Sequence, residues 1–180
     1  TLSNTIVGSN NEDSRALTIN TVAEANYDYA GTIASTISGI TKTGAGTQIL
    51  SGDNSAYAGT TRIEGGKLVA ANANALGSGP VTVAADAKLG LVAGTAVTVT
   101  NGIDLASGAK IVVDMTGVVA GTEDDIVLTL VSETALNYDE TGSFDTTGML
   151  GNVVVLENLS ETLSAWTQSL SYADNTLQLT

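Results

Sequence analysis

The sequence contains no histidine and no cysteine, and it has one proline, one phenylalanine and one tryptophan among 180 residues. Zinc and copper sites usually recruit histidine or cysteine, and serine triads and most proton shuttles at neutral pH depend on histidine. These site classes are therefore excluded. What remains is carboxylate chemistry, a cation bound by oxygen ligands, or no chemistry. The lack of cysteine by itself assigns no cellular compartment.

Basic side chains are also few, with 6 against 19 acidic ones and a formal net charge of −13. Nucleic acids and anionic membrane surfaces are bound through Lys and Arg, so the charge argues against both as partners. The last basic residue is Lys110, and eleven carboxylates follow it. We expect no membrane insertion, because the longest apolar runs, such as 126–131, fall far short of the roughly 20 residues that a spanning helix needs.

The residues that are abundant favour strands. Thr and Val are frequent while straight-chain helix formers are scarce, and charged residues make up only 14% of the chain. Aromatic residues make up 4%, which is low for the core of a sandwich or an antiparallel barrel. We therefore expect an all-β protein with a narrow, aliphatic core.

Short bursts of alternating apolar residues recur along the chain, separated by Gly, Asn and Asp. Five of them begin six or eight residues apart, at 81–83, 89–91, 97–99, 103–105 and 111–113. Three such strands make a repeat of roughly 22 residues, as in solenoids, and 180 residues would then form about eight coils. The spacing predicts a right-handed parallel β-helix in a single domain, 1–180. The alternative is a β-sandwich of about eight strands.

The C-terminal part carries two local signals of its own. Apolar alternation at 169–172 and 176–179 flanks Asp174 and Asn175, which tolerate the left-handed backbone conformation of a tight turn. This pattern predicts a terminal hairpin at about 166–180. Helix is expected only between Asn158 and Ser164, as one or two turns.

Residues 40–70 carry the most distinctive motif and read ITKTGAGTQILSGDNSAYAGTTRIEGGKLVA. This segment resembles the autotransporter-associated β-strand repeat, also called the passenger-associated transport repeat. The pattern of that family runs Lys-Thr-Gly-x-Gly-Thr-Leu-x-Leu-Ser-Gly, then Asn, Tyr, Gly and Thr, then Gly-x-Leu. The residues that carry the resemblance are Lys42, Gly44, Gly46, Leu50, Gly52, Asn54, Tyr57, Gly59, Thr61, Gly66 and Leu68.

Two positions depart from the family pattern. Gln48 stands where Leu is usual, and Ala56 is inserted between Asn54 and Tyr57. A one-residue change of register at either place would turn the side chains of a strand from the core to the solvent.

The resemblance implies a function as well as a fold. It implies the secreted passenger of an autotransporter-like bacterial protein: a non-enzymatic stalk or scaffold that supports secretion and folding. The implied location is the extracellular space or the bacterial cell surface, reached by export across the outer membrane. The implied partner is the rest of a larger surface protein, including a membrane β-barrel. The alternative function is an adhesin or glycan-binding module that recognises a host or glycan ligand.

Carboxylates are the remaining candidates for metal binding or catalysis. Glu123-Asp124-Asp125 is a compact cluster, but it lacks the alternating ligands of a calcium loop, so a solvated turn is favoured and no metal or cofactor is expected. Asp104, Asp114 and Asp139-Glu140 are the carboxylates that a polysaccharide-active enzyme would use. Neither basic nor aromatic residues that grip a sugar accompany them, so we expect no enzymatic activity.

Four tyrosines are the candidates for contact with a glycan or a partner. Tyr27, Tyr29, Tyr57 and Tyr172 are expected to be exposed, either to bind such a ligand or to pack over the edges of coils with their hydroxyl groups in water.

Overall fold

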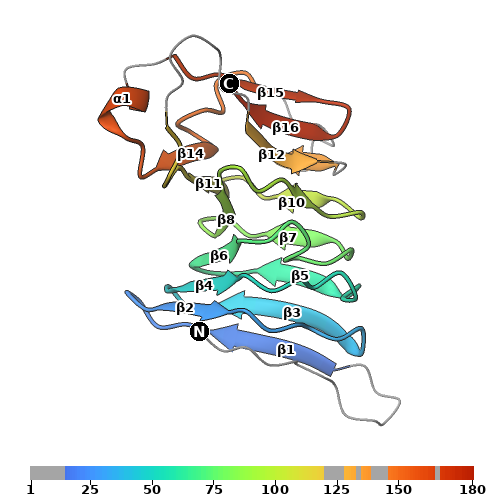
Figure 1. Ribbon diagram of the computed structural model, residues 1–180. Helices are drawn as coiled ribbons and strands as arrows, with labels where there is room; N and C mark the ends of the chain where they lie inside the picture. Colours follow the sequence, from blue (N-terminus) through green and yellow to red (C-terminus); the bar gives the residue numbers. More distant parts are fainter. Residues whose placement is uncertain (1–14, 120–127, 133–134, 139–145, 165–166) are drawn as a thin grey trace.

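The computed structural model describes residues 15–119, 128–132, 135–138, 146–164 and 167–180. Strands dominate this part of the chain, with one short helix near the C-terminal end (Figure 1). The elements are β1 (Arg15–Asn20), β2 (Asn26–Tyr29), β3 (Ile37–Thr43), β4 (Thr47–Leu50), β5 (Thr60–Ile63), β6 (Lys67–Ala70), β7 (Val81–Val83), β8 (Lys88–Val92), β9 (Val97–Thr98), β10 (Ile103–Leu105), β11 (Lys110–Asp114), β12 (Leu128–Ser132), β13 (Leu136–Tyr138), β14 (Val154–Glu157), α1 (Glu161–Ser164), β15 (Leu170–Ala173) and β16 (Thr176–Leu179).

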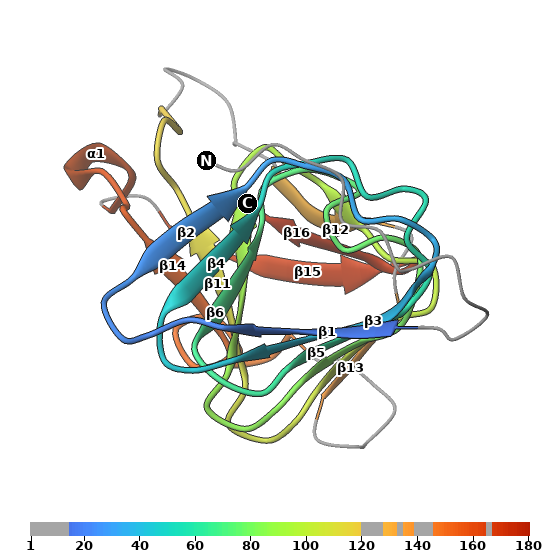
Figure 2. The same cartoon turned by 90° about the horizontal axis from the view of Figure 1, so that it is seen from below.

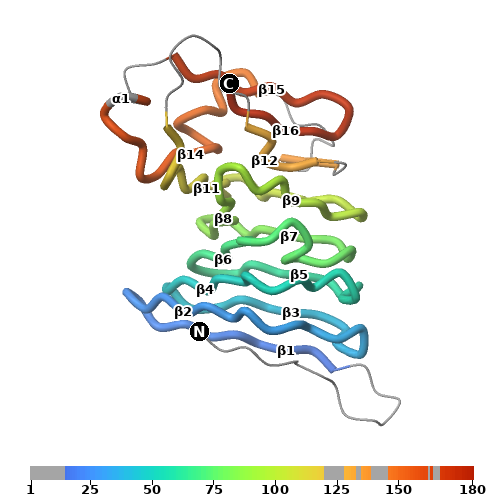
Figure 3. Tube along the Cα trace, viewed as in Figure 1, coloured from blue at the N-terminus to red at the C-terminus, as the bar shows by residue number. Residues whose placement is uncertain are grey.

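The molecule contains two long sheets, and each consists of parallel strands. The first sheet has the strand order β1-β3-β5-β7-β10-β13, and the second has the order β2-β4-β6-β8-β11-β14. Seen from the N-terminal end in Figure 2, the chain turns clockwise as it moves away from the viewer, which makes the coil right-handed. The path from coil to coil can be followed in Figure 3. The predicted right-handed parallel β-helix is therefore confirmed, and the molecule is not a sandwich.

The length of the central coils follows from the register of the second sheet. Thr47 pairs with Lys67, Lys67 with Lys88, and Lys88 with Lys110. One turn of the coil therefore takes about 21 residues, which lies within the usual range of solenoid repeats. The coil length that the sequence predicts is confirmed for this part of the stack.

The predicted number of coils is wrong, because the later coils are longer. On the first sheet Asp104 pairs with Asn137, and the two are 33 residues apart in the chain. On the second sheet Ile111 pairs with Val154, and even more residues separate these two in the chain. Within the described residues, each long sheet consequently has six strands and not eight.

The core lies between the sheets and is aliphatic, as expected. Leu68, Leu89 and Ile111 stack in register on β6, β8 and β11, and each is fully buried. Burying an aliphatic side chain of this size contributes about 1.5–3 kcal/mol. Each coil obtains that contribution only by lying against its neighbours, so the stack is held together by contacts between successive levels.

The strands at the C-terminal end are paired differently from those in the rest of the stack. A third sheet pairs β9 with β12 in parallel, then β12 with β16 and β16 with β15 in antiparallel fashion. The β15–β16 turn contains Asp174 and Asn175 with positive φ angles of 49° and 57°, as the sequence predicts. The hydroxyl oxygen of Tyr172 accepts a hydrogen bond from the backbone N–H of Leu136 at 2.9 Å, which ties the hairpin to β13.

Among the residues placed by the structure, helix occurs only in the interval where the sequence predicts it. α1 forms one turn and follows β14 in the chain (Figure 1). In the part of the chain that the structure describes, no helix has the length and apolar character needed to cross a membrane.

Candidate functional site

The repeat-like segment 40–70 builds two successive levels of the coil. It runs through the end of β3, β4, β5 and β6, so its first and second halves lie on top of each other. Leu50, Thr61 and Leu68 lie on the strands and point into the core, each with no more than 1% of its surface exposed. The other motif residues are polar or lie at the turns, and they determine how one level sits on the next.

Lys42 is buried in spite of its charge. It follows Ile40 on the inward side of β3 and has 0% of its surface exposed. Its Nζ donates hydrogen bonds to the carbonyl oxygens of Thr43 at 2.7 Å, Gly44 at 3.0 Å and Gly65 at 3.0 Å. Burial lowers the pKa of the Lys42 ammonium. Because Gly65 belongs to the next level, the ammonium group links two coils at their shared corner.

The motif glycines allow backbones of neighbouring levels to touch. Gly44 has a φ of +73°, and a Cβ there would lie 2.2 Å from the carbonyl oxygen of Thr21. A Cβ on Gly46 would lie 2.1 Å from the carbonyl oxygen of Val22. Both distances are too short for any side chain. The same close approach occurs for Gly52 against Gly31, for Gly59 against Ser38 and for Gly66 against Gly46.

Asn54 joins three levels through its side chain. Its Oδ1 accepts a hydrogen bond from the backbone N–H of Ile33 at 2.8 Å, and its Nδ2 donates to the carbonyl oxygen of Ala75 at 2.7 Å. Only 1% of its surface is exposed. Ile33 lies 21 residues before Asn54 and Ala75 lies 21 residues after it, so the amide bridges the coil below and the coil above.

The two departures from the family pattern leave the strands in register. Gln48 points inward with 7% of its surface exposed, and its Nε2 donates to the carbonyl oxygens of Tyr27 at 3.2 Å and Ile49 at 2.8 Å. The inserted Ala56 is exposed in a turn that the Tyr57 N–H closes onto the Asn54 carbonyl at 2.8 Å. The insertion is absorbed by this turn and therefore does not displace β5 or β6.

The tyrosine prediction is wrong for Tyr57 and Tyr29. Tyr57 is fully buried, its hydroxyl donates to the carbonyl oxygen of Thr60 at 2.8 Å, and burial raises its pKa. Tyr29 is only 9% exposed. Tyr27 is 53% exposed, as predicted, while Tyr172 is partly buried and holds the terminal hairpin. Tyr57 fills a corner of the core, where no ligand can reach it.

The two candidate carboxylates that the structure describes, Asp104 and Asp114, do not lie together. Asp104 lies on β10 of the first sheet and accepts a hydrogen bond from Asn137 Nδ2 at 2.6 Å. Asp114 lies on β11 of the second sheet, where hydrogen bonds from Asn158 and then Thr116 lower its pKa. They therefore belong to separate faces of the molecule.

The remaining acidic candidates fall on other parts of the chain. Glu123-Asp124-Asp125 and Asp139-Glu140 lie outside the described residues. Among the residues that are described, no group of three acidic side chains is placed to hold a metal ion.

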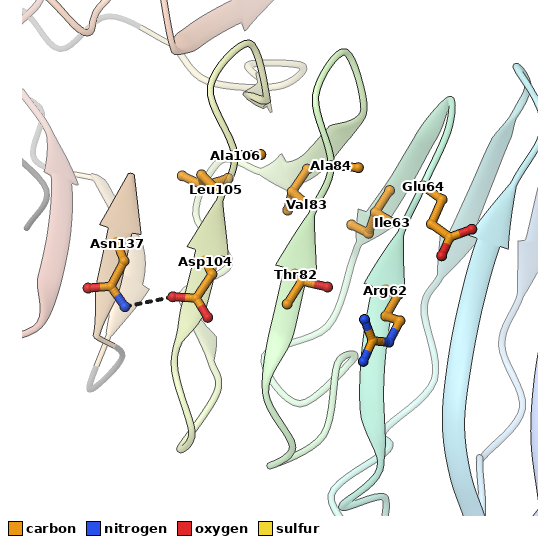
Figure 4. A pocket seen from close by; sticks show the side chains of 10 residues that line it. All are labelled: Arg62, Ile63, Glu64, Thr82, Val83, Ala84, Asp104, Leu105, Ala106 and Asn137. Carbon is orange, nitrogen blue, oxygen red and sulfur yellow. Dashed lines mark hydrogen bonds between the residues drawn. The ribbon is translucent and has the colours of Figure 1, made fainter. Parts of the chain in front are cut away.

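The outer face of the first sheet carries a groove that the sequence does not reveal. It has a volume of about 540 Å³ and lies over β5, β7 and β10 (Figure 4). Arg62, Thr82, Asp104 and Asn137 line it from four successive strands. The residues are far apart in the chain, and they form a row only once the coil register is known.

Comparison with known proteins identifies the segment that builds the two linked levels. A family model described as Passenger-associated-transport-repeat matches residues 40–70. The predicted resemblance is thereby confirmed, over the segment that contains Lys42, Asn54 and the close-contact glycines. No curated protein matches the chain, and no solved structure matches it either.

Proposed function

We propose that this chain, whose residues 40–70 form a passenger-associated transport repeat, is a non-enzymatic structural segment of a secreted bacterial surface protein. In this proposal the coil stack acts as the stalk or scaffold of an autotransporter-like passenger and supports its secretion and folding. One observation carries the proposal: the polar residues of the repeat are buried as links between levels. Lys42 and Asn54 are 0% and 1% exposed, so neither is available to a ligand in solution.

The proposed folding mechanism is stepwise. Asn54 is satisfied only when the level of Ile33 and the level of Ala75 are both in place, and Lys42 needs the level of Gly65. Because each level is stable only against its neighbours, ordering can spread along the chain from a level that has already formed. A chain that emerges from a membrane gradually would then fold as it emerges.

The proposed location is the bacterial cell surface after export across the outer membrane. The repeat family supports this location, and a chain without cysteine is compatible with it because no disulfide has to form during passage. The proposed partner is the rest of a larger surface protein that includes a membrane β-barrel.

The test replaces Gly44 and Gly46 by Val in a full-length parent protein and measures display on intact cells with antibody and external protease. We expect display to fall, because each Val would collide with a backbone carbonyl of the level below. The matched control is Gly94→Val with Gly117→Val, since both have positive φ angles but no described atom within 4 Å of the Cβ position. Unchanged display in the Gly44 and Gly46 variant would refute the proposal.

A further inference from the structure

The groove on the first sheet is lined by one outward side chain from each level. Arg62 pairs in register with Thr82, Thr82 with Asp104, and Asp104 with Asn137. Neighbouring strands in a sheet lie about 4.8 Å apart, so Arg62 and Asp104 stand about 10 Å apart along the stack. The volume of about 540 Å³ lies within the range of small-ligand sites.

The two ends of the row differ in chemistry. At one end Asp104 accepts a hydrogen bond from Asn137 and presents further acceptor positions to the groove (Figure 4). At the other end Arg62 is exposed, and its guanidinium makes no ion pair or hydrogen bond with the described residues. Thr82 lies between them with a hydroxyl that both donates and accepts. The row therefore combines one available guanidinium with several groups that bind hydroxyls.

We propose that this groove binds a linear glycan that carries a single carboxylate, such as an oligosaccharide with one uronate unit. A sugar carboxylate pairs with the guanidinium of Arg62 in the bidentate geometry that Arg favours. The ring hydroxyls of the following sugar units hydrogen-bond to Thr82, Asp104 and Asn137. The ligand lies along the stack, so one sugar unit spans about one strand spacing. The inference goes beyond the proposed scaffold role and does not depend on it.

The lining of the groove favours this ligand over a neutral glycan. Neutral sugars bind mainly by stacking on aromatic rings, and no aromatic side chain of the described residues lines the groove. Small side chains, Ala84 and Ala106, lie beside the polar row and leave it open. In this groove an ionic contact at Arg62 therefore takes the place of the aromatic stacking that binds neutral sugars in other proteins.

Peptides and nucleic acids fit the groove less well. β7 pairs with β5 on one side and β10 on the other, and β5 and β10 also have two neighbours each, so none of these three strands has a free edge for a peptide strand. A nucleic acid needs several cations, whereas Glu64 and Asp104 lie in the groove together with Arg62.

The test is a titration of the whole chain with a short oligosaccharide that carries one uronate unit, followed by calorimetry and by NMR chemical shifts. We expect saturable binding that Arg62→Gln weakens by at least about tenfold, because it removes a charge-assisted bidentate contact. The control is Lys88→Gln, which removes an exposed cation from the second sheet and should leave the affinity unchanged. Circular dichroism of both variants verifies that the coil is intact.

A second ligand makes the result decisive. The methyl ester of the same oligosaccharide keeps the ring hydroxyls but has no carboxylate, so it should bind at least about tenfold more weakly than the acid form. Three outcomes would overturn the proposal: no binding of the acid form at millimolar concentration, equal binding of the ester, or equal losses in the Arg62 and Lys88 variants.

Discussion

Replacing Asn54 by Ala should strongly destabilise the stack. The change removes the acceptor of the Ile33 N–H and the donor to the Ala75 carbonyl. Ile33 and Ala75 are 1% and 0% exposed, so water cannot replace the lost amide without opening the coil. Two backbone groups on two different levels are left without partners at once.

The size of the effect follows from the number of buried polar groups that lose their hydrogen-bond partner. A buried polar group that loses its hydrogen-bond partner costs about 1–3 kcal/mol, so the two groups cost about 2–6 kcal/mol together. A whole domain is typically stable by only about 5–15 kcal/mol. Asn54→Ala should therefore remove a large share of the free energy of unfolding.

The assay is urea unfolding followed by circular dichroism, with Asn101→Ala as the control. Asn101 also donates its Nδ2 to a carbonyl of the level below, that of Ser78 at 2.8 Å, but it is exposed. Its truncation should change the free energy of unfolding by about 0.5 kcal/mol or less. The reasoning is refuted if Asn54→Ala costs less than about 1 kcal/mol or no more than the control. Faster hydrogen exchange at the Ile33 amide gives a local readout of the same loss.

Three further predictions concern charged groups. Burial lowers the pKa of Lys42, so the Lys42 amine binds its proton more tightly in the unfolded chain than in the folded one. The stability of the wild type should therefore rise relative to Lys42→Met as pH increases from the lowered pKa to 10.5. Urea unfolding at several pH values measures this difference. Hydrogen bonds lower the pKa of Asp114, so its contribution should be complete above pH 3.8 and disappear as pH falls through the lowered pKa; Asp114→Asn should lose less stability than wild type in an acid titration. Lys67→Gln should cost less than about 1 kcal/mol, and less again in high salt, because its 2.9 Å ion pair with Glu157 is partly exposed; an unaltered cost in high salt would contradict this.

The coil architecture could be predicted from sequence because its two determinants are local. Alternating apolar residues indicate which side of each strand is buried, and their even spacing indicates the coil length. The number of coils was not predictable in the same way. The step from Asp104 to Asn137 takes 33 residues, and nothing in the local pattern predicts a step of that length.

The buried polar links are only half visible in the sequence. Lys42 stands two residues after Ile40, so the alternation itself places it on the inward side. Its acceptor on Gly65 belongs to the next level, and the exact stacking of levels is needed to find it. The exposure predicted for Tyr57 is wrong for the same reason, because this residue fills a corner of the core that only the stacked coil creates.

The groove row shows the limit of sequence reasoning most clearly. Arg62, Thr82 and Asp104 follow one another at intervals of one coil each, and Asn137 comes 33 residues after Asp104. No short motif connects them. The register of the first sheet alone brings their side chains into one line.

The strands of the two long sheets lie across the stack, and this orientation has a mechanical consequence. A force that pulls the two ends of the stack apart breaks the hydrogen bonds between neighbouring levels one level at a time. Each central level, such as the one from Lys67 to Lys88, holds about 21 residues and would extend by about 70 Å when released. The central levels should therefore release in steps of similar length under tension. The largest force should be needed where the Asn54 amide crosslinks three levels.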